Sequence, residues 1–285
     1  MKRLLLVLAS FVLALVAASA PRAAAGGAEP LQYVALGDSY AAASGVFPLA
    51  AGAPPECLQS RRNFAHDIAA SVGAQLTDVT CGAAETKDFS PSQSPGVAPQ
   101  LDALGPDAQL VTMTIGGNDN NTFIGAIVKC GAAGLSTLGQ GSPCRDRYGN
   151  QFRHDIRHTT YPALVKALQG VHRRAPHARV AILGYPWILP PTVGCFDKMT
   201  VAEGDVPYLR SEQATLNDAV KRAAAATGAK YVDMSVVSEG HDACQPIGTR
   251  WIEPVLQGDN PVIVHPNAYG EQQMAEQTMA TLHLK

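Results

Sequence analysis

The sequence predicts an α/β protein with three layers, in which helices cover both faces of a central parallel sheet of five strands. Five short apolar or β-branched segments, each the length of a buried strand, are spread along the chain. Segments with the apolar spacing of helices separate them, and strands that alternate with helices favour a parallel sheet. Glycine turns follow three of these strands, at the sheet edge where open α/β sheets bind their ligands.

Each element follows from its local pattern. The strands are expected at residues 34–36, 75–80, 110–115, 179–183 and 230–234. The helices are expected at residues 64–72, 161–174, 206–226 and 267–282. Gly228 closes the third of these helices, and Pro176 follows the second, as helix ends require.

Residues 1–25 have the parts of a secretory signal peptide. Lys2 and Arg3 form a basic start, residues 4–16 are almost wholly apolar, and small residues follow. The apolar run is too short to span a bilayer comfortably, which favours a removed leader over a retained anchor. We therefore expect a secreted protein.

The candidate cleavage sites are Ala18-Ser19-Ala20 and Ala23-Ala24-Ala25. The second is favoured, because Pro21 would follow a cut after Ala20. Residues 26–285 are enough for one large α/β domain with a sizeable core. Three of the 22 basic residues leave with the leader, so 19 face 24 acidic residues, and the net charge changes from −2 to −5. A mildly acidic chain gives no reason to expect a nucleic-acid partner.

The six cysteines favour disulfides over free thiols in a secreted chain. No pair has the Cys-x-x-Cys spacing of zinc or thioredoxin-like sites. The sequence leaves fifteen pairings open. We predict the sequential one, in which each bridge closes a modest loop and contributes roughly 2–4 kcal/mol. It joins Cys57–Cys81, Cys130–Cys144 and Cys195–Cys244.

Ser39, Gly82 and Asn118 each follow a predicted strand. Because the carboxyl ends of parallel strands lie at one edge of a sheet, the three loops are expected to converge there. If a helix starts near Ser39, its free N–H groups and positive dipole end lie close to the hydroxyl. That environment suits a nucleophile whose attack generates an oxyanion.

Four short blocks occur in a fixed order along the chain. They are Gly37-Asp38-Ser39, Gly82, Gly116-Gly117-Asn118-Asp119 and His265-Pro266. In this order they resemble the blocks of the SGNH hydrolase family, also called GDSL lipases and esterases. The leader and the six cysteines also resemble the extracellular actinobacterial members. The resemblance covers nearly the whole mature chain and implies the flavodoxin-like SGNH hydrolase fold and a secreted carboxylic ester hydrolase.

The resemblance implies a role for each block. Ser39 would attack the ester, and His265 would be its base, because a serine hydroxyl is a poor nucleophile and imidazole titrates in the useful range. The N–H groups of Ser39 and Gly82, with the side-chain amide of Asn118, would form the oxyanion hole.

The chain departs from the family at one position, because the acid that usually lies three residues before the histidine is Val262 here. We predict a Ser–His dyad in which a backbone carbonyl near Val262 or Ile263 holds Nδ1–H of His265 and fixes its tautomer and orientation. The rival orienter is Asp259, reaching in from upstream. We prefer to interpret Asp259 as a solvated turn residue.

Other polar residues are expected to support the site or to lie outside it. Asp38 and Asp119 would hold their loops through hydrogen bonds to turn amides. His154 and His158 have the i, i+4 spacing of a zinc helix, but no third ligand is near, so a polar helix face is preferred. We expect no metal and no cofactor.

Apolar and aromatic residues at 47–49 and 185–190 suit an acyl chain, although packing of the loops explains them equally well. The resemblance implies hydrolysis of lipid or small acyl esters. We expect a monomer whose contact with lipid surfaces, if any, is transient. Two alternatives stay open. One is a carbohydrate O-acetylesterase that uses the same site, and the other is a secreted binding protein without activity, which the intact site residues oppose.

Overall fold

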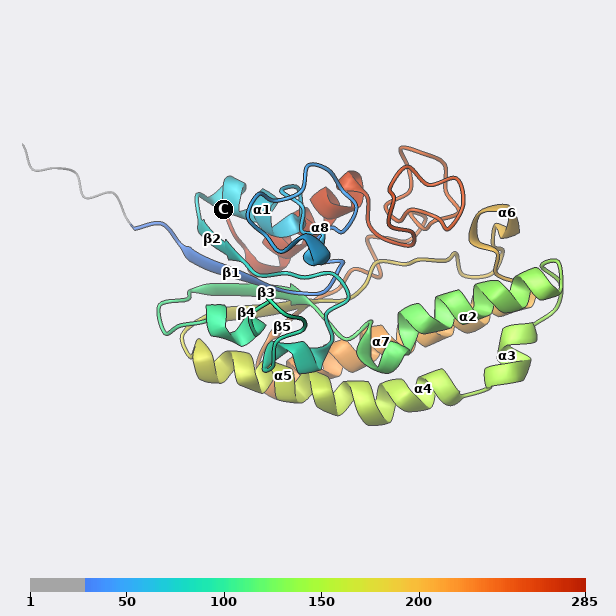
Figure 1. Ribbon diagram of the computed structural model, residues 1–285, viewed down its shortest axis with the longest axis horizontal. Helices are drawn as coiled ribbons and strands as arrows, with labels where there is room; N and C mark the ends of the chain where they lie inside the picture. The colour runs from blue at the N-terminus through green and yellow to red at the C-terminus, as the bar shows by residue number, and fades with distance from the viewer. Residues whose placement is uncertain (1–28) are drawn as a thin grey trace, which may run out of the picture.

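The computed structural model describes residues 29–285, so the predicted leader and its cleavage sites lie outside the described residues. A five-stranded sheet with the order β2-β1-β3-β4-β5 forms the centre, and all neighbouring strands are parallel. Helices cover both faces, which confirms the predicted three-layer architecture (Figure 1). The strands are β1 (Gln32–Gly37), β2 (Gln75–Asp78), β3 (Leu110–Thr114), β4 (Arg179–Leu183) and β5 (Lys230–Val232).

The two helical layers differ in size. On one face α1 (Phe64–Val72) and α8 (Ala268–Leu282) pack together, and on the other α5 (Tyr161–Arg174) packs on α7 (Val206–Thr227). The helix α2 (Phe123–Ser136) contacts α7 and extends away from the sheet (Figure 1). Shorter helices are α3 (Pro143–Tyr148), α4 (Gln151–Asp155) and α6 (Phe196–Met199), and single turns are η1 (Pro55–Cys57), η2 (Thr86–Phe89), η3 (Gln100–Ala103), η4 (Asp119–Asn121), η5 (Ile156–Thr160) and η6 (Glu203–Asp205).

The central strands contribute to the two larger hydrophobic cores of the described residues. Strand β3 is buried along its whole length, as expected for a parallel strand covered on both faces. Side chains of β1 alternate between the two layers. Tyr33 and Ala35 join the core under α1 and α8, whereas Val34 and Leu36 join the larger core under α5 and α7.

Strands β2 and β5 are shorter than predicted, and aspartates account for both differences. The Asp78 carboxylate accepts a hydrogen bond from the Thr80 N–H at 3.0 Å, and the Asp233 carboxylate accepts one from the Ser235 N–H at 2.9 Å. Such Asx turns bend the backbone out of a regular strand. The apolar pattern runs past these turns, which is why it overestimates the strand lengths.

Residues 123–155 hold three helices to which the sequence analysis gave no bounds. Helix α2 contains Gly125, Gly131 and Gly134, and glycine lowers the intrinsic preference for helix. A Cβ at Gly134 would collide with the Thr200 carbonyl, so glycine lets the segment before η6 lie directly on α2. Tertiary packing therefore overrides local propensity here.

Three disulfides stabilise the loops, with the sequential pairing that was predicted: Cys57–Cys81, Cys130–Cys144 and Cys195–Cys244. The second bridge ties α2 to α3, and the first ties η1 to the segment that follows β2. No helix in the described part of the chain is both long and apolar enough to cross a membrane.

Candidate active site

The loops after β1, β2 and β3 meet at the carboxyl edge of the sheet. Strand β1 lies between β2 and β3, so the chain order reverses there, and parallel sheets bind ligands at such switch points. The Cys81 N–H donates to the Gly37 carbonyl at 3.0 Å, and the Asp38 N–H donates to the Thr114 carbonyl at 2.9 Å. Both neighbouring loops are therefore tied to the turn that carries Ser39.

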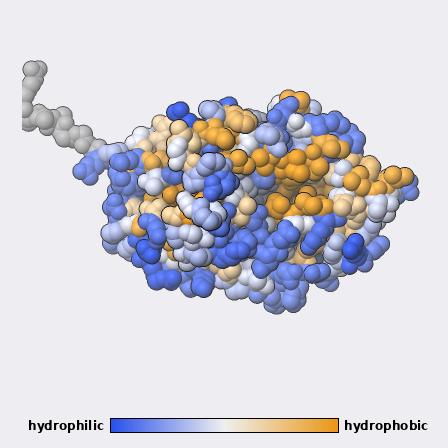
Figure 2. All heavy atoms as spheres, in the orientation of Figure 1, coloured by the Kyte–Doolittle hydropathy of each residue, from blue (hydrophilic) through white to orange (hydrophobic). Residues whose placement is uncertain are grey.

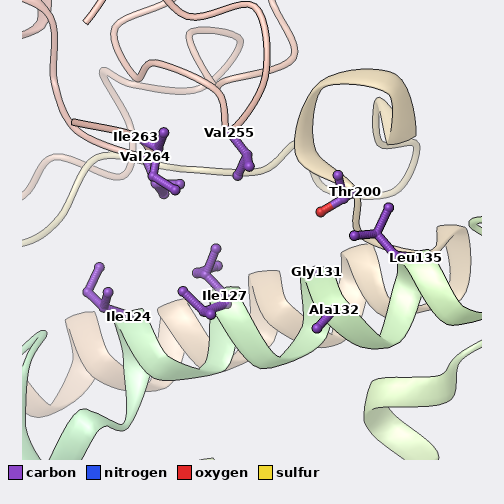
Figure 3. A pocket seen from close by; sticks show the side chains of 10 residues that line it. Ile124, Ile127, Gly131, Ala132, Leu135, Thr200, Val255, Ile263 and Val264 are labelled. Atoms are coloured by element: carbon purple, nitrogen blue, oxygen red, sulfur yellow. The ribbon is translucent and has the colours of Figure 1, made fainter. Parts of the chain in front are cut away.

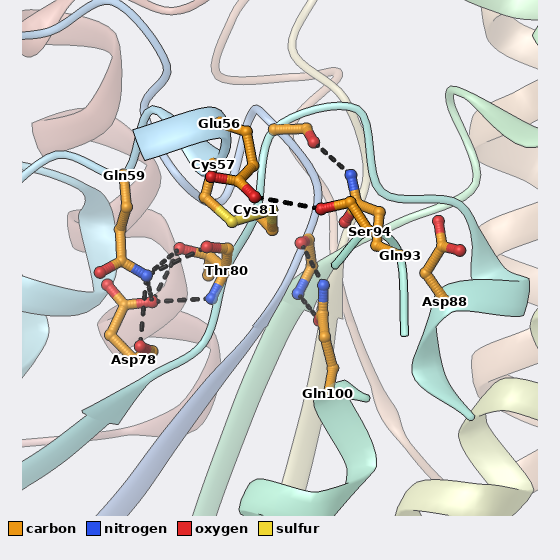
Figure 4. Close-up of a disulfide and its surroundings, with 12 residues drawn as sticks. Glu56, Cys57, Gln59, Asp78, Thr80, Cys81, Asp88, Gln93, Ser94 and Gln100 are labelled. Atoms are coloured by element: carbon orange, nitrogen blue, oxygen red, sulfur yellow. Dashed lines mark hydrogen bonds between the residues drawn. A yellow bond between two sulfur atoms is a disulfide. The ribbon is translucent and has the colours of Figure 1, made fainter. Parts of the chain in front are cut away.

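Gly37 fixes the start of this turn. Its φ is +125°, and an added Cβ would collide with the Thr114 carbonyl, so only glycine fits. The Gln100 side chain accepts from the Gly37 N–H at 2.7 Å and donates to its carbonyl at 2.9 Å (Figure 4). The turn is thus held by contacts at the backbone itself.

Asp38 is buried and links the turn that carries Ser39 to the loop after β3. Its carboxylate accepts from the Tyr40 N–H at 3.0 Å, from the Thr114 hydroxyl at 2.7 Å and from the Tyr185 hydroxyl. The Tyr185 oxygen in turn accepts from the Gly117 N–H at 2.9 Å. Burial raises the pKa of Asp38 to about 6, although these hydrogen bonds oppose the rise.

Ser39 and His265 lie in hydrogen-bond contact. Nε2 of His265 is 2.7 Å from Oγ of Ser39, and Nδ1 is 2.7 Å from the Ile263 carbonyl oxygen. A carbonyl can only accept, so Nδ1 carries the proton, and in the neutral ring Nε2 accepts from the serine hydroxyl. The imidazole therefore presents an acceptor nitrogen to the Ser39 hydroxyl.

Tyr40, the residue after the serine, holds the loop that carries the histidine. Val264 has φ +61°, a conformation that β-branched residues rarely adopt. Its carbonyl accepts from the Tyr40 hydroxyl at 2.6 Å, and its N–H donates to the Glu253 carbonyl at 2.9 Å. The Tyr40 ring also packs against the His265 ring, with centroids 5.1 Å apart. These contacts fix the backbone on both sides of Val264, and with it the Ile263 carbonyl that accepts from Nδ1 of His265.

Within residues 29–285, no carboxylate hydrogen-bonds to the His265 ring. The rival orienter Asp259 is 68% exposed at its side chain and pairs with Arg250 at 3.2 Å. Its N–H donates to the Glu253 carboxylate at 2.8 Å. Arg250 and Glu253 form a buried ion pair, so Asp259 caps this pair at the surface.

The Asn118 loop is fastened to the segment after β2. The Asn118 Nδ2 donates to the Ala84 carbonyl at 3.0 Å, and one of its two hydrogens remains for another acceptor. The buried Asp119 carboxylate accepts from the Thr86 N–H at 2.8 Å and from the Thr86 hydroxyl at 2.7 Å. Burial raises the pKa of Asp119 to about 6. These contacts agree with the supporting task expected of Asp119.

The Gly82 N–H, expected to face the substrate, donates instead to the Cys57 carbonyl at 2.8 Å. The next residue, Ala83, is exposed and has φ +61°. Gln93 Nε2 holds the Gly82 carbonyl at 2.7 Å, beside the disulfide of Figure 4. Because C=O and N–H of a trans peptide point in opposite directions, the Ala83 N–H is turned away from Gln93. It has no hydrogen-bond partner within residues 29–285.

His154 and His158 lie far along the chain from these loops, on the exposed side of α4 and η5. Their ring centroids are 4.4 Å apart, and His154 Nδ1 is 3.5 Å from the Asp155 carboxylate. No cluster of three or more potential metal-binding side chains occurs in the described part of the chain.

An apolar groove of about 260 Å³ opens beside the loop of His265. Figure 2 shows hydrophobic residues gathered around a hollow on this face, and Figure 3 shows the groove between α2 and the loops above it. One stripe of α2 forms its floor: Ile124, Ile127, Val128, Gly131, Ala132 and Leu135. The facing residues are Thr200, Val255, Ile263 and Val264.

The groove lies elsewhere than the apolar wall that the sequence predicts. None of residues 47–49 or 185–190 lines it. Tyr185 is buried against Asp38, and the Trp187 ring stacks on the Arg210 guanidinium at 3.6 Å. The i, i+3, i+4 spacing of the apolar residues of α2 is the signal that would have revealed this wall.

A parallel α/β/α sandwich that sets a serine against a backbone-held imidazole at its carboxyl edge has the architecture of a serine hydrolase. The model of the GDSL-like lipase/acylhydrolase family matches residues 35–273, and the chain belongs to this family. This confirms the resemblance seen in the four sequence blocks. The protein is a carboxylic ester hydrolase, a lipase or esterase of the GDSL family.

Named relatives and solved structures agree with this family assignment. Lipase 2 of Streptomyces coelicolor is 60% identical over 277 residues, which are 96% of this chain and 94% of the relative. The crystal structure of phospholipase A1 from Streptomyces albidoflavus matches with a TM-score of 0.73 and 26% identity, over 88% of this chain and 99% of that one. The extracellular lipase of Streptomyces rimosus matches over the same shares with a TM-score of 0.72 and 26% identity.

Proposed function

We propose that the chain is a secreted lipase or esterase in which Ser39 and His265 act as a dyad without a carboxylate. The observation that carries the proposal is the position of the imidazole, 2.7 Å from Ser39 Oγ and 2.7 Å from the Ile263 carbonyl. Nε2 takes the hydroxyl proton as Oγ attacks the ester carbonyl, and then gives it to the leaving alcohol. Water repeats the two steps on the acyl-serine and releases the acid.

The oxyanion is proposed to bind the Ser39 N–H, the second amide hydrogen of Asn118 and the Ala83 N–H. The Ala83 N–H takes the place expected for that of Gly82, which is engaged with the Cys57 carbonyl. The segment of Ala83 is bonded to the nucleophile turn on one side and to Asn118 on the other. Donors held in this way need no rearrangement when charge develops.

Secretion is supported by the three disulfides, because such bonds persist in oxidising compartments. The extracellular lipase of Streptomyces rimosus is a relative with the same fold. In the proposed mature protein, residues 1–25 are removed and residues 26–285 form a single hydrolase domain. It acts as a monomer on lipid or small acyl esters.

The test of this proposal is hydrolysis of aryl esters by the purified protein, followed by treatment with a fluorophosphonate that labels activated serines. We expect loss of activity in step with one adduct per chain, located on the peptide that contains Ser39, and no effect of a chelator. Full activity after labelling elsewhere, or activity that a chelator removes, would overturn the serine mechanism.

Asp259→Asn is expected to change kcat/KM for an aryl ester by less than about threefold, since surface ion pairs contribute little. Arg250 keeps its buried partner Glu253 in this variant, so the fold should persist. Steady-state kinetics and thermal melting check both statements. A loss well beyond tenfold would identify Asp259 as the orienter of His265 and contradict the backbone-carbonyl dyad.

The acid limb of the pH profile is expected to lie below the ordinary imidazole pKa of about 6.5. Burial lowers the pKa of His265, although the hydrogen bond to the Ile263 carbonyl opposes the change. Only the neutral ring accepts the serine proton, so a lowered pKa extends activity toward acid. Measurement of kcat/KM against pH checks this, and a midpoint at or above 6.5 would contradict it.

Tyr40→Phe is expected to lower kcat about tenfold, the cost of roughly one lost hydrogen bond. Without the hydroxyl, Val264 is less firmly held in its left-handed conformation, which stores roughly 1–3 kcal/mol, and the Ile263 carbonyl moves away from Nδ1. The measurement is kcat for the single variant and for the double variant with Val264→Gly.

Glycine adopts positive φ without steric cost, so the second substitution should restore kcat to within about threefold. Unchanged thermal melting with reduced kcat would separate positioning from folding. An equal loss in the single and double variants would mean that the Tyr40 hydroxyl acts in some other way.

A further inference from the structure

The hydroxyl group of Tyr185 connects the two loops between which an ester oxygen would bind. We infer that Tyr185 is a positioning residue for ester hydrolysis, which holds the loop of Asn118 at a fixed distance from the turn that carries Ser39. The inference rests on the proposed function, because it takes the Ser39 N–H and the Asn118 amide as donors to the oxyanion.

The Tyr185 oxygen joins these loops through one hydrogen bond to each. It donates to the buried Asp38 carboxylate and accepts from the Gly117 N–H at 2.9 Å. These partners directly precede the serine and the asparagine of the site. Within the described residues, no hydrogen bond joins residues 38–44 directly to residues 116–119. The relative position of the two loops therefore depends on Tyr185.

Tyr185 is itself held firmly. It follows β4, and its backbone is gripped by the buried Asn217 of α7, whose side chain accepts from the Tyr185 N–H at 2.8 Å and donates to the Tyr185 carbonyl at 3.0 Å. The Tyr40 ring packs edge-on against the Tyr185 ring, with centroids 5.1 Å apart. An added Cβ at Gly117 would lie only 3.0 Å from the Tyr185 hydroxyl oxygen, so the ring lies directly against that backbone. Tyr185 can thus set the position of the loop rather than follow it.

The position of the loop affects the rate because the two donors come from different loops. A donor stabilises the developing charge only when it lies roughly 2.7–3.1 Å from the place that the oxyanion takes. A misplacement of about 1 Å can cost about 10²-fold in rate. Phenylalanine at position 185 would leave the buried Asp38 carboxylate and the Gly117 N–H one partner short, so both loops would shift to satisfy them.

Tyr185→Phe is expected to lower kcat for an aryl ester about 10–100-fold and to change KM by less than about threefold. The loss is smaller than the roughly 10²–10³-fold cost of an absent oxyanion donor, because the Asn118 amide is still present but poorly aimed. A loss confined to kcat is the signature of an interaction made in the transition state. Steady-state kinetics measure both constants, and an unchanged kcat would overturn the inference.

Tyr33→Phe is the matched control. Tyr33 is also buried, and its hydroxyl hydrogen-bonds to the Thr112 hydroxyl in the core under α1 and α8, so this variant loses a buried hydroxyl without touching either loop. It should keep kcat within about twofold of the wild type, even where thermal melting shows a similar loss of stability in both variants. Equal losses of kcat in the two variants would make the role of Tyr185 structural and overturn the inference.

A double variant tests whether Tyr185 acts through Asn118. Asn118→Ala removes the donor, so the position of its loop should then matter little. Addition of Tyr185→Phe should lower kcat by less than about threefold, because residues that act as one unit lose their joint contribution once. Losses that multiply would show that Tyr185 acts apart from the oxyanion donor, against the inference.

Gly117→Ala disturbs the same contact from the other side and keeps the test valid if Tyr185→Phe does not fold. The φ of Gly117 lies outside the left-handed region, so alanine is compatible with its backbone, but the methyl group displaces the Tyr185 hydroxyl. We expect kcat to fall about tenfold in a protein that melts near the wild-type temperature, and an unchanged kcat would contradict the inference. Absence of ester hydrolysis in the wild type would instead refute the proposed function.

Discussion

Ser39→Ala is expected to lower kcat for aryl ester hydrolysis by roughly 10⁵–10⁶-fold, the loss typical of removing the nucleophile of a serine hydrolase. Without Oγ no acyl-enzyme forms, and His265 has no hydroxyl to activate. Residual rate would come from water attacking an ester whose oxygen the N–H donors still polarise. Steady-state kinetics at a high enzyme concentration, with substrate still in excess, would resolve so small a rate.

His265→Ala should be nearly as damaging, and the double variant should be no slower than either single one. Residues that work as one unit lose their joint contribution once, so their effects do not add. Thermal melting should show a folded protein in each case. Losses that multiply in the double variant would show two independent contributions and contradict a dyad, and full activity of Ser39→Ala would place the nucleophile elsewhere.

The sheet and the edge that carries the site were predictable because local patterns determine them. Apolar strand-length segments such as 110–115 and turns such as that at Gly37 are visible without any tertiary contact. Parallel strands also present their carboxyl ends together, so Ser39 and Asn118 were expected on one edge. The structure adds the strand order, which places β1 between β2 and β3.

Features that depend on contacts between distant segments were less predictable. The sequence left three candidates for the group that holds His265 Nδ1: Val262, Ile263 and Asp259. Which of them does so depends on the backbone conformation of Val264. Contacts with Tyr40 and Glu253, from elsewhere in the chain, hold that conformation. The glycines of α2 lower its intrinsic preference for helix, so this helix, which packing stabilises, was not predicted. The apolar wall of the groove was missed with it.

The same limit applies to Gly82. A family block identifies a residue type, but the direction of a peptide N–H depends on which acceptor lies opposite. Here that acceptor is the Cys57 carbonyl, brought to Gly82 by the disulfide from Cys57 to Cys81. The donor directed at substrate is then proposed to be the next one along the chain, that of Ala83.

Exchanging single backbone amides for esters separates these two neighbouring donors, because each exchange replaces one N–H by an oxygen and keeps the side chain. At Ala83 we expect kcat to fall about 10²–10³-fold, the usual cost of one oxyanion donor, with little change in KM. At Gly82 we expect kcat near that of the wild type and a loss of roughly 1 kcal/mol in the free energy of unfolding. The α-hydroxy acid counterparts of the two residues provide the variants.

Each exchange also weakens the preceding carbonyl as an acceptor, which supplies a control. At Ala83 this is the Gly82 carbonyl held by Gln93, so Gln93→Leu, which removes that donor and keeps the N–H, should cost far less activity than the ester. The opposite pattern, with kcat lost only at Gly82, would return the donor to Gly82 and require the bond to Cys57 to break when substrate binds. If both backbone-ester variants kept full activity, the oxyanion hole would consist of the Ser39 N–H and the Asn118 amide alone.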